Sequence, residues 1–273
     1  MYSFGPLPRQ KRSGRHLGTH QKVDRIARRH LAPYLDARLV FPNIKDILHF
    51  EGSRGPDGIK LKSPGRDEPL HFIDPKKPEG ELLEHIRNHT HNLKKALIDA
   101  DTTRAAFEAA WLAHAVADGL TPAHHESMHE QIRHMKHTDE EKLRKVRGKV
   151  VMGGTTRKEV IMNNWQFWGA KGIMTSHTLF EAGIAVAAKP YKFKSGMPFT
   201  HDIESLENEG FEHVYVRLIT EIAALDMYEK FKKLGWTNEL ARLTNKQLLP
   251  RVVLAITLVW YDAYMAALKE VHA

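Results

Sequence analysis

The sequence predicts an all-α fold, a single-domain multi-helix bundle with long irregular loops. Apolar residues recur at helical spacing in several segments, and no segment shows the convincing alternation of a strand. The 273 residues, 42% of them hydrophobic, suffice for one large core or two small ones. The chain has no cysteine, which excludes disulfides and thiolate metal sites.

The expected helices begin after a basic, Pro- and Gly-rich stretch at residues 1–18, which we interpret as a flexible tail. Apolar side chains at helical spacing predict a helix over 20–39. Residues 41–80 carry many Pro and Gly without a sustained period, which predicts a long irregular segment that is either functional or disordered. Helices follow over 81–98 and about 102–118, the second capped by Asp101 or Thr102 and stopped by Pro122.

The second half is expected to start with a basic insertion, residues 125–164, which predicts an exposed loop or flap. Further helices are predicted over about 165–188, 201–234, 237–244 and 246–271, so that the main domain covers 19–273. The most apolar stretch, 252–268, contains Asp262 and is short for a membrane span. It suits a buried core helix, and we expect no transmembrane segment.

The composition indicates a preference for anionic ligands and a capacity to bind metal ions. The net charge of +8 favours anions such as nucleic acid, anionic lipid or phosphorylated metabolites, although surplus surface lysine is an equally good explanation. The 18 histidines are roughly three times the ordinary share. Because neutral imidazole is the commonest metal ligand, this surplus without cysteine points to a site of His, Asp and Glu.

Two pairs of metal-ligating residue types stand at helical spacing. His114 and Asp118 are four apart, so both project from one helix face. Pro122 ends that helix and turns His124 back toward the same site. His177 and Glu181 form the second pair, and with His124 they supply two imidazoles and one carboxylate, leaving an open coordination position. One such pair alone is usually a salt bridge or a cap, but the combination predicts a metal site.

The spacing His-x3-Asp-x5-His, followed by His-x3-Glu, resembles the signature of the zinc-dependent phospholipase C family, which is related to the fungal single-strand zinc nucleases. The segments 70–75 (LHFIDP) and 251–264 resemble that family too, and the likeness is closer to the phospholipase C branch. The resemblance implies two to three zinc ions in a trinuclear-type site. The implied ligands are His71, His114 and Asp118 for the first ion, and His124, His177 and Glu181 for the second.

The resemblance also implies a third ion, bridged by Asp118 and held by His20. In the family an N-terminal Trp completes this site, but the first Trp here is Trp111, and His16 is a candidate replacement. Asp57, fourteen residues before His71, matches a family Asp that acts as ligand or general base. Less well placed rivals are Asp46, Glu51 and Asp67.

The implied activity is a zinc-dependent phosphodiester hydrolase that uses a zinc-bound hydroxide to attack phosphorus. The substrate is a phospholipid or a nucleic acid, and an anionic membrane surface is a candidate partner. Gly58 stands where the phospholipase branch carries an aromatic residue for choline. Phe72 is the candidate substrate-binding residue, since it could stack a base, and core packing is the competing interpretation.

Three alternatives stay open. One is a single-strand nuclease or nucleotidase of the same fold, and another is a non-enzymatic, zinc-stabilised binding protein. A third class covers other helical metal sites, either a His-Asp phosphohydrolase using His177, His201, Asp202 and Asp262, or a di-iron bundle. The N-terminus has no signal peptide, which favours a cytoplasmic location, whereas the family resemblance favours secretion.

Overall fold

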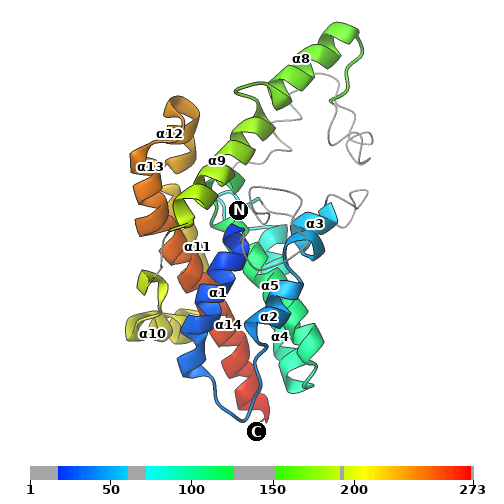
Figure 1. Cartoon of the computed structure of the whole chain (residues 1–273). Coiled ribbons are helices and arrows are strands. Elements are labelled where there is room, and N and C mark those ends of the chain that lie inside the picture. Colours follow the sequence, from blue (N-terminus) through cyan, green and yellow to red (C-terminus); the bar gives the residue numbers. More distant parts are fainter. Residues whose placement is uncertain (1–17, 61–71, 126–151, 191–193, 272–273) are drawn as a thin grey trace.

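The computed structural model describes residues 18–60, 72–125, 152–190 and 194–271, which are almost wholly helical (Figure 1). Within these ranges the single extended pairing is an isolated bridge between Asp74 and Lys77. The all-α prediction is therefore confirmed. The tail at 1–17 and residues 126–151 of the predicted insertion lie outside the described residues, so the predicted domain division stays a prediction.

The core is built around α14 (Leu249–Val271), the red helix of Figure 1. It packs against α1 (Thr19–Leu31), α4 (Glu81–Ile98), α5 (Thr102–Gly119) and α11 (Phe211–Ala223). The buried Trp260 donates its indole N–H to the carbonyl of Ala109, 3.0 Å away, which ties α14 to α5. The stretch Asn238–Val271 is long and apolar enough to cross a membrane, but its most apolar window is 67% buried inside the fold. The predicted core helix is confirmed.

The pair α4 and α5 lies as the sequence predicts. Asp101 caps α5, since its side chain accepts from the Arg104 backbone N–H at 2.9 Å. At the other end of α5, a Cβ on Gly119 would come 2.2 Å from the hydroxyl of Tyr215. That hydroxyl donates to the Val116 carbonyl at 3.0 Å. Only glycine therefore lets α11 approach the end of α5, next to Asp118.

In the first half, two predictions are corrected. The helix expected over 20–39 ends at Leu31, because Pro33 follows within a short 3₁₀ turn, η1 (Ala32–Tyr34). The segment 41–80 is not uniformly irregular. It contains α2 (Ile44–His49), the 3₁₀ turn η2 (Gly52–Arg54) and α3 (Pro56–Lys60).

In the second half, two helices that were expected to be continuous are divided, at glycine residues and at Asp226. The helix predicted over 165–188 is the last turn of α8 (Arg157–Trp168) followed by α9 (Ile173–Ala188), separated by Gly169 and Gly172. Most of α8 lies in the segment 125–164 that was predicted to be a loop, so that prediction is wrong for residues 157–164. The helix predicted over 201–234 is α10 (Thr200–Glu209), α11 and α12 (Met227–Leu234). Gly210 and Asp226 adopt positive φ of 79° and 52° at these breaks. Then α13 (Asn238–Leu243) and a π-helical turn, η5 (Thr244–Leu248), lead into α14.

Candidate metal centre

A first group of candidate ligands joins α1 to α5. His20 lies in the first turn of α1, while His114 and Asp118 lie one turn apart near the end of α5. The two imidazoles stack with centroids 4.0 Å apart. Oδ1 of Asp118 lies 3.2 Å from Nε2 of His20, and Oδ2 lies 3.3 Å from Nε2 of His114. Each oxygen of the carboxylate thus faces one imidazole.

A second group joins the turn after α5 to α9. His124 ends the 3₁₀ turn η3 (Pro122–His124), so the chain turns back after Pro122. Oε1 of Glu181 lies 3.0 Å from Nε2 of His124 and 3.3 Å from Nε2 of His177. The rings of His124 and His177 stack with centroids 4.9 Å apart.

Asp118 connects the two groups. Its Oδ1, which faces His20, also lies 3.7 Å from Nδ1 of His124. The structure therefore brings together His20, His114, Asp118, His124, His177 and Glu181, which the sequence singled out. A carboxylate shared between two sets of imidazoles is suited to bridging two cations.

Two carboxylates from the 41–60 segment approach opposite edges of the His114 ring. Oδ1 of Asp57, on α3, lies 3.5 Å from Nε2, the nitrogen that also faces Asp118. Oε1 of Glu51 lies 3.5 Å from Nδ1. Asp57 is therefore placed to share a cation with His114, whereas Glu51 is placed to orient the ring from behind. The sequence had treated Glu51 only as a rival to Asp57.

Sequence reasoning missed Asp24. This residue is fully buried on α1, and neither of its oxygens hydrogen-bonds to a described group. Burial raises the pKa of Asp24 well above its ordinary value, and the nearby Glu51 carboxylate raises it further. The spacing His20-x3-Asp24 repeats that of His114 and Asp118, and this signal could have found it.

Burial and neighbouring charges shift the pKa values of the candidate ligands, and the shifts favour metal-binding protonation states at His124 and Asp118 but not at His114. Burial lowers the pKa of His124 to about 4, so its imidazole is neutral at pH 7. Burial alone would raise the pKa of Asp118, but surrounding positive charge, including His124 and His114, holds it well below its ordinary value. The pKa of His114 moves the other way. Burial would lower it, but Asp118, Asp57 and Glu51 raise it well above its ordinary value.

The donors fit zinc. In each group, one ligand atom per residue lies within 4.8 Å of the others, and the atoms are imidazole nitrogens and carboxylate oxygens. The fully buried His20 makes no well-aligned hydrogen bond to a described residue, and the polar contact of its Nε2 is the one at 3.2 Å to Asp118, so a cation between the two would satisfy this nitrogen. Three protein ligands in a group leave one position of a tetrahedral ion open.

Of the remaining predicted residues, Phe72 lies beside the metal centre and others lie outside the described residues. Phe72 is half-buried beside the second group, with its ring centroid 5.7 Å from that of His124. The next residue is anchored there, since Ile73 donates its backbone N–H to the His124 carbonyl at 3.1 Å. His71 and His16 lie outside the described residues, as does Asp67.

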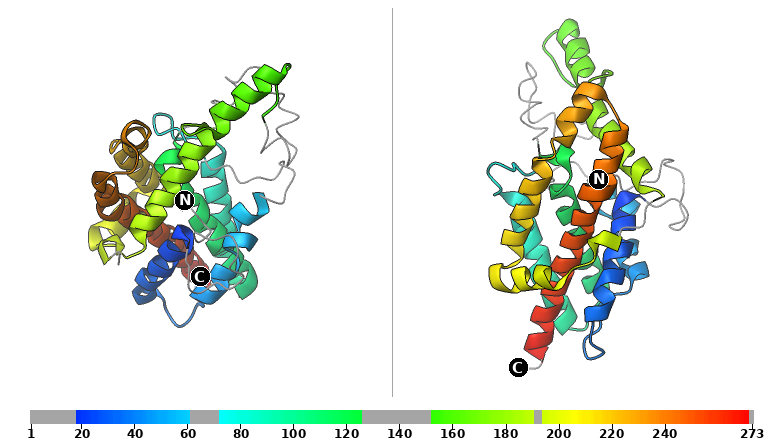
Figure 2. Two further views of the ribbon diagram at one scale, coloured as in Figure 1. Left: turned by 45° about the horizontal axis from the view of Figure 1, so that its top comes forward. Right: turned by 90° about the vertical axis from the view of Figure 1, so that its left-hand side faces the viewer.

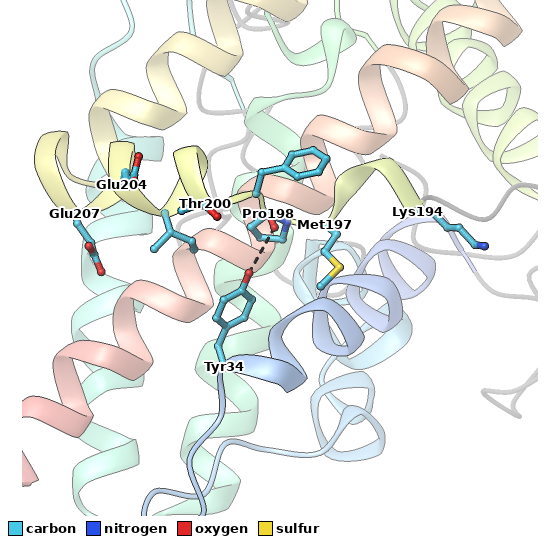
Figure 3. A pocket seen from close by; sticks show the side chains of 9 residues that line it. Tyr34, Lys194, Met197, Pro198, Thr200, Glu204 and Glu207 are labelled. Atoms are coloured by element: carbon cyan, nitrogen blue, oxygen red, sulfur yellow. Dashed lines mark hydrogen bonds between the residues drawn. The ribbon is translucent and has the colours of Figure 1, made fainter.

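The His-Asp phosphohydrolase alternative is not assembled by the described residues. His177 groups with His124 and Glu181, whereas the side chain of His201 is 73% exposed on α10. A cavity of about 690 Å³ does lie beside α10 and is lined by Tyr34, Met197, Pro198, Thr200, Glu204 and Glu207 among others (Figure 3). None of its lining residues is a candidate ligand, so it is separate from the metal centre.

Glu51→Gln is expected to weaken zinc binding by about 10- to 100-fold, because Glu51 faces the far nitrogen of the candidate ligand His114 and its loss would disturb the tautomer and orientation of that ring. Zinc affinity would be measured by competition with a chromophoric chelator. Glu79→Gln, which removes an exposed carboxylate, is the matched control. Equal affinities for the two variants would show that Glu51 does not orient His114.

Comparison with known proteins gives a likeness among solved structures alone. A scan of protein-family models and a search of curated proteins find no match. Among solved structures, the crystal structure of Clostridium perfringens alpha-toxin from avian strain SWCP superposes with a TM-score of 0.51 and 14% sequence identity, covering 91% of this chain. The chain has an alpha-toxin-like fold.

The alpha-toxin likeness concerns the fold alone, given the low identity. This chain spans 63% of the length of the toxin chain. The likeness agrees with the phospholipase C-like helical fold that the sequence predicts.

Proposed function

We propose that the protein is a zinc-dependent phosphodiester hydrolase of the phospholipase C type. The observation that carries the proposal is the pair of buried His/carboxylate groups joined through Asp118. The alpha-toxin-like fold and the family signature in the sequence support it. Zinc bound here would lower the pKa of a coordinated water and offset negative charge on the phosphoryl oxygens.

The protein's own residues supply positioning. The stacked pairs His20–His114 and His124–His177 fix the directions of their nitrogens before any cation binds. Because burial keeps His124 neutral, its nitrogen can coordinate without first losing a proton at pH 7. The ligands of both groups thus reach the cation in a set geometry.

Asp57 differs from the other carboxylates of the centre in its access to solvent. Its side chain is 23% exposed, whereas that of Asp118 is 2% exposed. We propose that Asp57 either completes the ligand set of His114 or accepts the proton of the attacking water. Its partial exposure to solvent suits Asp57 to both roles, because a substrate or a water molecule can reach it.

Phosphodiester hydrolysis is tested with three substrates, bis-p-nitrophenyl phosphate, phosphatidylcholine and single-stranded DNA, each with and without chelator. We expect hydrolysis of bis-p-nitrophenyl phosphate and phosphatidylcholine that chelator abolishes and added zinc restores. Cleavage of DNA alone would favour a nuclease, in which Phe72 beside His124 would stack a base. Inactivity on all three substrates would contradict the proposal and favour a zinc-stabilised binding protein.

A further inference from the structure

Helix α8 carries large apolar side chains that the described part of the chain leaves open to solvent. Ile161 and Trp165 are 71% and 70% exposed, and Met162 and Trp168 are 50% and 43% exposed. Exposed apolar side chains are ordinary when scattered. Four of them on one helix of twelve residues, including two of the chain's five tryptophans, form a surface that needs an explanation.

These four residues lie on one side of the helix. At 100° per residue they fall within an arc of about 120°. The opposite side is the attached one. There Phe167 is buried with Met152, and Asn163 donates its side-chain N–H to the Gly153 carbonyl at 2.6 Å. The helix is therefore fixed to the protein by one face and presents the other outward, and we call that outward face the α8 face.

Positive charge borders the α8 face. Arg157 and Lys158 are exposed in the first turn and fall on the same side as Ile161, and the exposed Lys171 follows the end of the helix. The acidic residue of that turn, Glu159, is engaged in the capping box with Thr156. Together with the net charge of +8, this border attracts an anionic surface.

We propose that the α8 face docks onto a lipid–water interface that contains anionic lipid. Trp residues settle at the headgroup level because the ring is apolar and the indole N–H is polar. Ile161 and Met162 add aliphatic surface that enters the acyl region. A nucleic acid would use the tryptophans for stacking but gives the two aliphatic side chains no partner, and a second copy would bring another +8 of charge against the same basic border.

The α8 face lies close in the chain to the metal centre. Only four residues separate α8 from α9, which carries His177 and Glu181. Figures 1 and 2 show α8 extending beyond the rest of the fold, along the line of α9. Docking of the α8 face would bring the metal centre of a phospholipid-cleaving enzyme to the lipid headgroups. The inference rests on the proposed function in this one respect, that lipid is also the substrate.

Co-sedimentation with vesicles of phosphatidylcholine and phosphatidylglycerol tests the proposal. The full chain is compared with the double variant Ile161→Ser/Trp165→Ser and with Leu234→Ser, which removes a 73% exposed apolar side chain on α12. We expect the double variant to lose about tenfold or more in partition coefficient and Leu234→Ser to match the unmodified protein. Helical circular dichroism and hydrolysis of soluble bis-p-nitrophenyl phosphate should be the same in all three.

Three results would overturn lipid docking. In the first, the unmodified protein fails to bind vesicles. In the second, the double variant binds vesicles as well as the control does. In the third, the double variant still binds vesicles but loses binding to single-stranded DNA or loses self-association. Hydrolysis of the soluble substrate bis-p-nitrophenyl phosphate tests the enzymatic function separately from lipid docking. Vesicle binding that depends on the α8 face in a preparation without phosphodiesterase activity supports docking and contradicts the enzymatic function.

Discussion

Asp118→Asn is expected to lower the zinc content by more than one ion per chain and to reduce phosphodiesterase activity by about a thousandfold. The carboxylate faces His20 and His114 with separate oxygens and also approaches His124, so its loss disturbs both groups at once. Asparagine has the same shape but offers one neutral oxygen in place of two charged ones. Native mass spectrometry would count the ions.

Asp99→Asn is the matched control for Asp118→Asn, because Asp99 is exposed at the end of α4. It should keep the full zinc content. An unchanged count in Asp118→Asn would show that this carboxylate does not bridge cations, and the metal centre would then have to be redrawn as two independent groups.

Glu181→Gln is expected to remove a single ion and to reduce activity by about a hundredfold. One oxygen of Glu181 serves both His124 and His177, while no described contact links Glu181 directly to His20 or His114. The first group should therefore keep its ion. We expect Asp118→Asn to lose more than one zinc ion and Glu181→Gln to lose one. This difference in zinc content measures how independently the two groups bind their ions.

Zinc content and zinc-edge absorption of the Glu181→Gln variant would check this expectation, with the exposed Glu84→Gln on α4 as control. Loss of every ion from Glu181→Gln would indicate that the two groups bind zinc only together. Retention of every ion would remove Glu181 from the ligand set.

Helices with clear ends could be predicted from the sequence. The bounds of α4 and α5 came out correctly because Asp101 caps one helix and Pro122 stops the chain beyond it. Breaks between helices of similar composition could not be predicted from the sequence. Gly210 and Asp226 interrupt a run of helix-forming residues through positive φ, and a backbone conformation of that kind depends on how α10, α11 and α12 pack.

The candidate site divides in the same way. Helical spacing predicted that His114 would meet Asp118 and that His177 would meet Glu181, since each pair lies on one helix. Glu51 could not be placed, because it stands in an aperiodic segment whose course is set by contacts with α5. Asp24 could have been found, but a lone pair with His20 at that spacing is usually a salt bridge.

The division of ligands among α1, α5, η3 and α9 has a consequence for a chain without cysteine. Cations at the two groups would act as cross-links, closing one loop between residues 20 and 114 and another between 124 and 177. Such clips restrict the unfolded ensemble much as a disulfide does, and their strength varies with free zinc instead of with redox potential. The anchoring of α1 and α9 would then follow zinc supply, while the packing of α14 against α4 would not.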